Sequence, residues 1–331
     1  MIKGLECYLV GGAVRDRILK RPIGDRDWVV VGSSPEEMIS LGFHPVGKKF
    51  PVYLHPQTKE EYALARKETK VDQGHLGFEI DASSTITLEE DLLRRDLTIN
   101  AIAEDLDGKL IDPFNGLKDI QNRLIRHVSQ AFAEDPLRVF RVARFMAELS
   151  EFKVVEQTRE LILRMSQDGA LRELPAERVS IEMLKALDSL NPQLFFEFLA
   201  GCNGLTDWFP ELTDRKFTFS SVDSIDRFCE LALEKKSFES LGKRLKLSKK
   251  YLVAARHWSS FGGLIKNWRG SPKEELYDCL YKTNFFHDDS NLQRLLNLAS
   301  KQGSYEFEEL ENILNKLADM DFAPKQSKLI G

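Results

Sequence analysis

The chain has 331 residues, 42% of them hydrophobic, so it is long enough for two or more units with buried cores. Its apolar runs, such as 28–31 and 101–103, fall far short of the ~20 residues of a membrane-spanning helix, and its first residues lack a signal-peptide pattern. With four widely spaced cysteines and a net charge of −5, the composition excludes a disulfide-stabilised or membrane protein and predicts a cytoplasmic protein with unpaired thiols.

Short β-rich runs alternate with turns up to about residue 130. Strands are predicted at 8–10, 28–31, 52–55, 61–65, 99–105 and 109–111, with a hairpin at Asp107-Gly108 between the last two. Ser34, Pro35 and Glu37 predict a helix start with a capping box. Beyond residue 130 a 3.6-residue periodicity predicts helices, among them 136–149, 178–189 and 291–302. The sequence therefore predicts an α+β protein with a strand-containing head and a helical remainder.

Two features near the N-terminus are typical of a phosphate-binding site. The segment 8–16 reads as a strand, a Gly11-Gly12 turn and a helix start, which leaves backbone N–H groups free for a phosphate. Asp25 and Asp27 lie two residues apart at the start of an apolar strand, where alternation places both carboxylates on one face. Such a pair favours Mg²⁺, which proteins hold with one or two carboxylates plus substrate phosphates.

Two arginine clusters follow. Arg94 and Arg95 precede Asp96, and a guanidinium fork suits phosphate and ribose oxygens, although a surface ion pair explains this cluster equally well. On the predicted helix at 136–149, the spacing places three arginines in one stripe opposite an apolar face. These are Arg138, Arg141 and Arg144, and the apolar face consists of Val139, Phe140, Val142, Ala143 and Met146. Asp135 before Pro136 is a plain candidate for the N-cap of this helix.

The C-terminal half contains a basic window between Lys235 and Lys273. It has eleven basic residues and one acidic residue, a net charge of +10, and Tyr251, Trp258, Phe261 and Trp268 are interleaved with them. This composition favours contact with a polyanion, and a solvated helix face is the alternative interpretation. The candidate contacts are Lys243, Arg244, Lys246, Lys249, Lys250 and Arg256.

The motifs together resemble the bacterial class II tRNA nucleotidyltransferases, the CCA-adding enzymes. The resemblance is carried, in order, by the segments 9–16 (LVGGAVRD), 25–27 (DRD), 94–101 (RRDLTINA), 112–116 (DPFNG), 134–138 (EDPLR) and 174–178 (LPAER). It implies a polymerase-β-like head with a mixed sheet over 1–128, a helical neck over 129–205 that recognises the nucleotide base, and a tRNA-binding body and tail over 206–331.

The resemblance also implies residue roles. Asp25 and Asp27 would hold Mg²⁺, Gly12, Arg15 and Arg95 would contact phosphates, and Arg94 and Asp96 would serve ribose recognition. Residues 112–116 would form the hinge between head and neck. Asp135 and Arg138 would read the base, with Arg141 and Arg144 nearby, and Glu177 and Arg178 would brace their helix. Arg66 and Lys67 begin a segment, up to Gly77, that matches the family's flexible loop and favours addition of the complete CCA.

The implied reaction is template-independent addition of CCA to tRNA from CTP and ATP, with no membrane or protein partner. A carboxylate and a guanidinium can accept cytosine or adenine and reject uracil and guanine, which carry a carbonyl in place of the amine. The alternatives are a CC-only or A-only adder, a poly(A) polymerase, and a non-enzymatic tRNA-binding or chaperone protein. His257 and His287 are the only histidines beyond residue 130, so we expect no HD hydrolase centre in this part of the chain.

Overall fold

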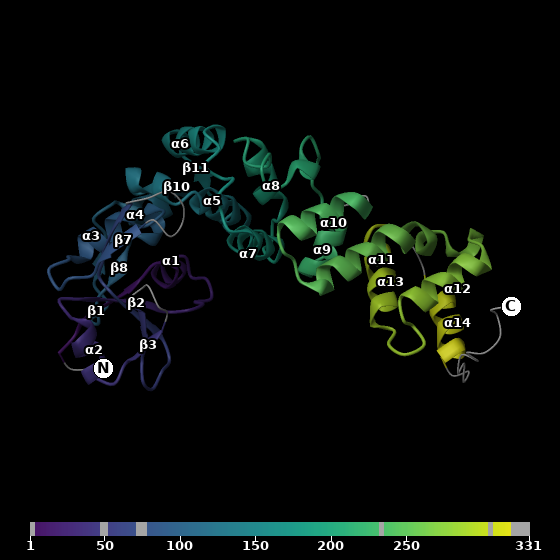
Figure 1. Ribbon diagram of the computed structural model, residues 1–331, viewed down its shortest axis with the longest axis horizontal. Helices are drawn as coiled ribbons and strands as arrows, with labels where there is room; N and C mark the ends of the chain where they lie inside the picture. Colours follow the sequence, from purple (N-terminus) through teal and green to yellow (C-terminus); the bar gives the residue numbers. More distant parts are fainter. Residues whose placement is uncertain (1–3, 47–51, 71–77, 232–234, 304–306, 319–331) are drawn as a thin grey trace.

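The computed structural model describes residues 4–46, 52–70, 78–231, 235–303 and 307–318. In Figure 1 the chain forms an elongated body, with the strands at the end that holds the N-terminus and the helices extending away from them. We use the name head for residues 4–128, neck for α5 to α8, and body and tail for α9 to α14. Among the described residues, no helix is long and apolar enough to cross a membrane.

The head is built on a mixed seven-stranded sheet with the order β3-β4-β5-β2-β1-β8-β9. Strand β2 runs parallel to β5, and the other neighbours in the sheet are antiparallel. The strands are β1 (Glu6–Val10), β2 (Asp27–Val31), β3 (His44–Val46), β4 (Val52–Leu54), β5 (Glu61–Leu64), β8 (Ala103–Glu104) and β9 (Leu110–Ile111). A separate antiparallel hairpin consists of β6 (Lys67–Lys70) and β7 (Phe78–Asp81).

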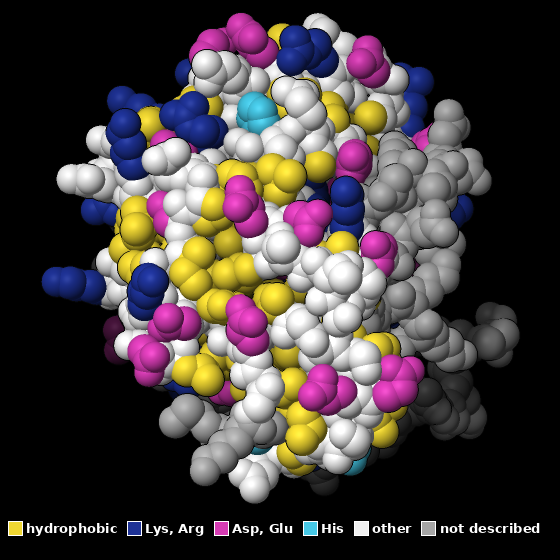
Figure 2. Space-filling model, turned by 90° about the vertical axis from the view of Figure 1, so that its left-hand side faces the viewer, with side chains coloured by type: hydrophobic (Ala, Val, Ile, Leu, Met, Phe, Trp, Pro, Cys, Tyr) yellow, Lys and Arg dark blue, Asp and Glu magenta, His cyan; other side chains and the backbone are white. Residues whose placement is uncertain are grey.

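Short helices connect the strands of the head. They are α1 (Gly12–Ile18), α2 (Pro35–Ser40), α3 (Leu88–Leu93) and α4 (Gly116–Gln121), with a 3-10 turn at Thr98–Asn100. Asp112 accepts hydrogen bonds from the backbone of Gly116 at 2.7 Å and Leu117 at 2.9 Å, so it caps α4. The face of the head that points away from the neck mixes apolar with acidic side chains (Figure 2), and Ile39 and Leu106 are about half exposed.

The neck surrounds an aromatic core. Its helices are α5 (Leu137–Glu148), α6 (Glu156–Gln167), α7 (Ala176–Leu187) and α8 (Gln193–Ala200), and a parallel pair of short strands, β10 (Leu124–Ile125) and β11 (Lys153–Val154), joins it to the head. Phe195, Phe196 and Phe209 pack edge to face with centroids 5.1–6.1 Å apart. The same hydrophobic core continues from Leu9 in the head to Ala255 in the body, so it holds α5 and α7 firmly against the head.

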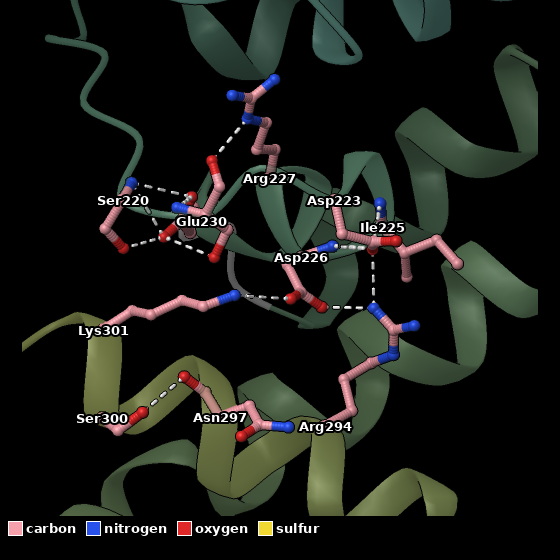
Figure 3. A network of polar contacts seen from close by, with 11 residues as sticks. Ser220, Asp223, Ile225, Asp226, Arg227, Glu230, Arg294, Asn297, Ser300 and Lys301 are labelled. Carbon is pink, nitrogen blue, oxygen red and sulfur yellow. Dashed lines mark hydrogen bonds and ion pairs between the residues drawn. The ribbon is translucent and has the colours of Figure 1, made fainter.

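The remaining helices are α9 (Ser224–Glu230), α10 (Lys235–Arg244), α11 (Lys249–Lys266), α12 (Lys273–Lys282), α13 (Ser290–Lys301) and α14 (Glu308–Ala318). A second core joins α11 to α12, α13 and α14. A polar network ties α9 to α13 (Figure 3), because the buried Asp226 accepts ion pairs from both Arg294 and Lys301. Asp223 also pairs with Arg294, at 2.7 Å.

Most sequence predictions for these elements are confirmed. The mixed sheet, the hairpin at Gly108 (φ 84°) and the helices predicted at 136–149, 178–189 and 291–302 are present within about two residues. The strand predicted at 99–105 is confirmed only over Ala103–Glu104. Ile99 and Asn100 belong to the 3-10 turn, because this segment bends and brings Asn100 to Arg15. All four cysteines are free, with Cys7 partly buried and the others buried.

The capping-box prediction for α2 is partly wrong. Ser34 caps the helix by accepting from the backbone of Glu37 at 3.3 Å, but the Glu37 carboxylate accepts from the Ser33 hydroxyl instead of returning to the cap. A complete capping box occurs in α3, between Thr87 and Glu90. The cap at α3 fixes the helix that carries the residues just before Arg94.

Candidate active site

A cavity of about 830 Å³ lies between the head and the neck, and we call it the head–neck pocket. Every residue that the sequence proposes for metal or nucleotide binding lines it, together with Arg66 of the proposed loop. Its charged lining residues are Arg15, Asp16, Asp25, Asp27, Glu61, Arg66, Arg94, Arg95, Asp96, Asp135, Arg138, Arg141, Arg144, Glu148, Arg178 and Lys185. A pocket this rich in both signs of charge suits a polyanionic ligand with polar edges better than an apolar one.

Asp25 and Asp27 lie on the head side of this pocket. Asp27 begins β2 opposite Val10, the residue before the glycine turn, and opposite Glu61 on β5. Asp25 precedes the strand, and both aspartates line the same pocket. Burial raises the pKa of Asp27, Arg95 opposes that shift, and Glu61 and Asp25 add to it. Asp25 therefore lies near enough to repel Asp27.

The donor set fits a divalent cation of the magnesium type. Two neighbouring carboxylates, one of them with a raised pKa, are stabilised when a cation lies between them. Among the described residues, no group of three or more His, Cys, Asp or Glu side chains is arranged to hold a metal ion. A two-carboxylate site matches Mg²⁺, which completes its shell with water and substrate phosphates.

The glycine turn brings backbone close to an arginine. Gly11 has φ 73°, and a Cβ at this position would lie 3.3 Å from Nη1 of Arg95. Any other residue would therefore be strained and would push Arg95 away. The turn leads directly into α1, as the sequence predicts, and Arg15 follows one turn later.

Arg15 is held in one orientation by three groups. It donates to both oxygens of Asp16 at 2.9 Å and to Oδ1 of Asn100 at 2.8 Å. Its guanidinium also lies 5.0 Å from the centre of the Phe145 ring on α5. Because the side chain is fixed before any ligand arrives, less conformational entropy is lost on binding.

Asp91 is a buried anchor for the arginine pair. Its carboxylate is 0% exposed, and it pairs with Arg94 at 2.5 Å and with Arg95 at 3.1 Å. Burial alone raises the pKa of Asp91, but Arg95 and Arg94 outweigh burial and lower it, so the carboxylate stays ionised. Nε of Arg95 is buried without a hydrogen-bond partner among the described residues, which leaves this guanidinium incompletely satisfied.

Two ion pairs attach the arginines of α5 to the head and to α7. Arg141 donates to Asp96 of the head at 2.6 Å, and Arg144 donates to Glu182 of α7 at 2.5 Å. Arg141, Asn100 and Arg138 overcome the effect of burial and hold the pKa of Asp96 far below its usual value. Arg144 is itself buried. All three arginines of the predicted stripe line the pocket, but Arg141 and Arg144 are already paired with carboxylates.

Asp135 and Arg138 meet at the start of α5. Asp135 accepts from Arg178 at 2.8 and 3.2 Å and from the backbone N–H of Leu137 at 3.2 Å. Arg138 donates to the carbonyls of Ala131 and Arg94. Among the described residues, Oδ2 of Asp135 accepts a bond from Arg178, and a carboxylate oxygen can accept two.

Glu177 does not brace α5 as the resemblance implies. It pairs with Lys246 of the body at 2.6 Å, whereas its neighbour Arg178 contacts Asp135. Adjacent residues on a helix point about 100° apart, so one reaches the pocket and the other faces the body.

Sequence reasoning missed four residues as functional candidates: Asn100 and Lys185, which line the pocket, and Asp91 and Glu182, which pair with arginines that line it. Asp91 had a signal, because it precedes Arg94 and Arg95 by three and four residues, the spacing of ion pairs along a helix. Glu182 is likewise four residues after Arg178 on α7. Asn100 and Lys185 had no such signal, since only the tertiary fold brings them to Arg15 and to the pocket rim.

The proposed loop residues divide between the pocket and the hairpin. Arg66 lines the pocket, and its carbonyl accepts from Nε of Arg94 at 3.1 Å. Lys67 is exposed at the start of β6. The rest of the expected loop, residues 71–77, lies outside the described residues, as does the tail from Ala323.

The candidate tRNA-binding residues fall into two groups, exposed lysines and residues already engaged in ion pairs. Lys243, Lys249 and Lys250 are exposed, with no ion-pair partner among the described residues. Arg244 instead pairs with Glu211 at 2.6 Å, Lys246 with Glu177, and Arg256 with Glu239 at 3.5 Å. Arg244 also donates to the carbonyl of Trp208, which makes it part of the packing between α10 and the neck.

Comparison with known families agrees with this architecture. Residues 7–126 match the family described as the poly(A) polymerase head domain, and residues 151–216 match the family described as a probable RNA and SrmB-binding site of polymerase A. The strand-containing head, which lines most of the pocket, is therefore similar to the poly(A) polymerase head domain.

Curated relatives narrow the assignment. A multifunctional CCA protein of Pseudoalteromonas atlantica is 56% identical over 210 residues, which cover 63% of this chain and 52% of that protein. A CCA-adding enzyme of Alteromonas mediterranea is also 56% identical, over 63% of this chain and 53% of that protein. The chain thus spans about half the length of these curated relatives.

A solved structure matches across nearly the whole chain. The CCA-adding enzyme of Bacillus stearothermophilus in complex with CTP is 25% identical, with a TM-score of 0.70 over 95% of this chain and 78% of that one. The chain is thus similar, over 63% of its length, to proteins named as CCA-adding enzymes, and its fold resembles that of a solved CCA-adding enzyme.

Proposed function

We propose that this chain adds CCA to the 3′ end of tRNA, without a template, from CTP and ATP. The observation that carries the proposal is the head–neck pocket, which combines a carboxylate pair, a glycine turn with fixed arginines, and the Asp135–Arg138 pair. The likeness to relatives named as CCA-adding enzymes supports the same activity. We place this reaction in the cytoplasm.

The first part of the proposed mechanism is binding of the triphosphate by the head. Asp25 and Asp27 would hold Mg²⁺, which would polarise the α-phosphate, favour ionisation of the tRNA 3′-hydroxyl and offset charge on pyrophosphate. Arg15 and Arg95 lie beside the glycine turn and would neutralise the phosphate oxygens. Their carboxylate partners, Asp16 and Asp91, hold both guanidiniums in place.

The second part is base selection by the neck. The exocyclic amine of cytosine or adenine would donate to a second acceptor position on Oδ2 of Asp135, and Arg138 would donate to the adjacent ring nitrogen. Uracil and guanine present a carbonyl to Asp135, which leaves the carboxylate unmatched at a cost of ~1–3 kcal/mol. Arg178 holds Asp135 in position for this contact.

The division of labour along the chain is part of the proposal. The head over 1–128 would carry the chemistry, the neck over 129–205 would select the base, and the body and tail over 206–331 would hold tRNA. The exposed Lys243, Lys249 and Lys250 support the last assignment, since an extended polyanion needs unpaired positive charge.

The experiment offers the protein a tRNA that ends at its discriminator base, with each nucleotide alone and then with all four, and sequences the product ends. Complete CCA ends support the proposal. Ends that stop at CC, a single A added only to tRNA-CC, or long A tracts would assign the chain to one of the alternative activities. Binding of tRNA with no incorporation under any condition would favour a non-enzymatic role.

A further inference from the structure

One cation in the head–neck pocket differs from six of the pocket arginines in how it is held. Lys185 on α7 lines the pocket, is exposed, and has no ion-pair partner among the described residues. By contrast, Arg15, Arg94, Arg95, Arg141, Arg144 and Arg178 each pair with a carboxylate. The charge on Lys185 is therefore available to a ligand without breaking an existing contact.

The position of Lys185 follows from the contacts of α7. Arg178, Glu182 and Lys185 are spaced by four and three residues, so they lie on one face of this helix. Arg178 contacts Asp135 just before α5, and Glu182 contacts Arg144 two turns into α5. Lys185 lies one turn beyond Glu182, ~10 Å along α7 from Arg178.

This places Lys185 away from the base-reading pair. If the order of contacts between α7 and α5 is continued, the pocket residue of α5 that corresponds to Lys185 is Glu148. The Glu148 carboxylate pairs with Arg144 at 2.7 Å, and the Glu148 backbone carbonyl accepts a hydrogen bond from Arg21 of the head. A nucleotide with its base at Asp135 and its phosphates on the head leaves this end of the pocket open. The strand that carries the attacking 3′-hydroxyl must enter from a side that the nucleotide does not occupy.

We propose that Lys185 binds a backbone phosphate of the tRNA 3′ end and so positions the primer; this inference rests on the proposed function. The chemistry of the residue fits the role. A lysine ammonium is a compact charge on a flexible side chain, and it can donate hydrogen bonds to a phosphate in many orientations. The guanidinium groups of the pocket arginines are instead held in one orientation by their partners. Because the primer lengthens by one nucleotide per step, a flexible side chain suits a contact with its backbone phosphates. Lys185 does not touch the reacting atoms, so it is a positioning residue.

The test compares the wild type with Lys185→Ala and Lys185→Arg in steady-state addition of CMP to a tRNA that ends at its discriminator base. Lys109→Ala, an exposed lysine in the turn between β8 and β9 and outside the pocket, is the matched control. For Lys185→Ala we expect the KM for tRNA to rise about threefold to fivefold, the range of one exposed charge pair. The KM for CTP and kcat should stay near wild type, and Lys185→Arg should restore the KM for tRNA.

Salt dependence provides the readout that a structural role would not change. Loss of one phosphate contact should lower the slope of log(kcat/KM) for tRNA against log[KCl] by ~0.7. An unchanged slope with an unchanged KM for tRNA would overturn the inference. A raised KM for CTP alone would overturn it too, because Lys185 would then serve the nucleotide. If the wild type itself incorporates no nucleotide, the proposed function fails, and binding of the tRNA measured at two salt concentrations still tests Lys185.

Discussion

The arginines of the head–neck pocket and the lysines of α10 and α11 have the same charge but are held in different ways. In the pocket, Arg95 and Arg144 are largely buried and bound to the carboxylates of Asp91 and Glu182. On the body, Lys249 and Lys250 project into solvent next to each other at the start of α11. A small nucleotide needs donors at fixed positions, whereas a long polyanion is attracted by charge that can move.

The two regions therefore predict different responses to mutation. Changes to the ion-paired arginines and carboxylates of the pocket should alter catalysis, base choice or stability with little dependence on salt. Changes to the exposed lysines of α10 and α11 should alter only the tRNA affinity and its salt dependence.

The largest effect is expected at the metal pair. Asp25→Ala removes one of two carboxylates that would hold Mg²⁺, so nucleotide incorporation should be abolished while tRNA binding survives. Primer-extension assays and filter binding on the same preparation measure both. Turnover close to that of the wild type would show that Asp25 is not a metal ligand.

The next largest effect is expected at the buried anchor. Asp91→Asn leaves Arg94 and Arg95 without their carboxylate, and removing one partner from a buried pair costs ~3–5 kcal/mol. Urea unfolding should show this loss at pH 7, together with a higher KM for CTP. Asp107→Asn, in the exposed turn before β9, is the matched control and should change neither quantity.

The same variant gives a pH prediction. Arg95 and Arg94 lower the folded-state pKa of Asp91 against the opposing effect of burial. Its stabilising contribution is therefore complete above the unfolded-state pKa of ~3.9 and is lost as the pH falls toward the lower folded-state value. The stability difference between wild type and Asp91→Asn should shrink below about pH 4. A difference that stays constant between pH 3 and pH 7 would contradict this assignment.

A change in selectivity is expected at the base-reading pair. Asp135→Ala removes the acceptor for the exocyclic amine and should narrow the preference for CTP over UTP by about tenfold to a hundredfold. Competition assays with mixed nucleotides measure the ratio directly. Retained selectivity, with only a lower unfolding midpoint, would mean that Asp135 serves α5 as a cap and a partner of Arg178.

The smallest effect is expected on the body. Lys249→Ala with Lys250→Ala should weaken tRNA binding severalfold and lower its salt slope by ~1.4, with kcat unchanged. Arg244→Ala should instead lower stability through loss of the Glu211 pair, because Arg244 is engaged in packing. Equal effects of both variants on the salt slope would remove the distinction between the two regions.

Much of this arrangement could be predicted from the sequence, because the head motifs are local. Consecutive residues with a recognisable pattern encode each of three features: the turn at Gly11-Gly12, the acids at the start of β2 and the helix after Pro136. The pairing of Arg141 with Asp96 and of Arg144 with Glu182 could not be predicted. These partners are separated by about 40 residues in the sequence, and only the packing of α5 against the head and α7 brings them together.

The bend at Ile99 and Asn100 shows a second limit. These residues read as the start of an apolar strand, but the chain turns there so that Asn100 can contact Arg15 and Asp96. Local β propensity was overridden by a tertiary contact. The wrong strand prediction at Ile99 and Asn100 and the failure to identify Asn100 as a site residue therefore have one cause.

The most direct test of the central claim is a crystal structure of the protein with CTP and Mg²⁺. The account predicts the triphosphate between the Asp25–Asp27 pair and the arginines Arg15 and Arg95, with the cytosine amine on Oδ2 of Asp135. A nucleotide bound outside the head–neck pocket, or bound inside it with the base turned away from Asp135, would contradict the account.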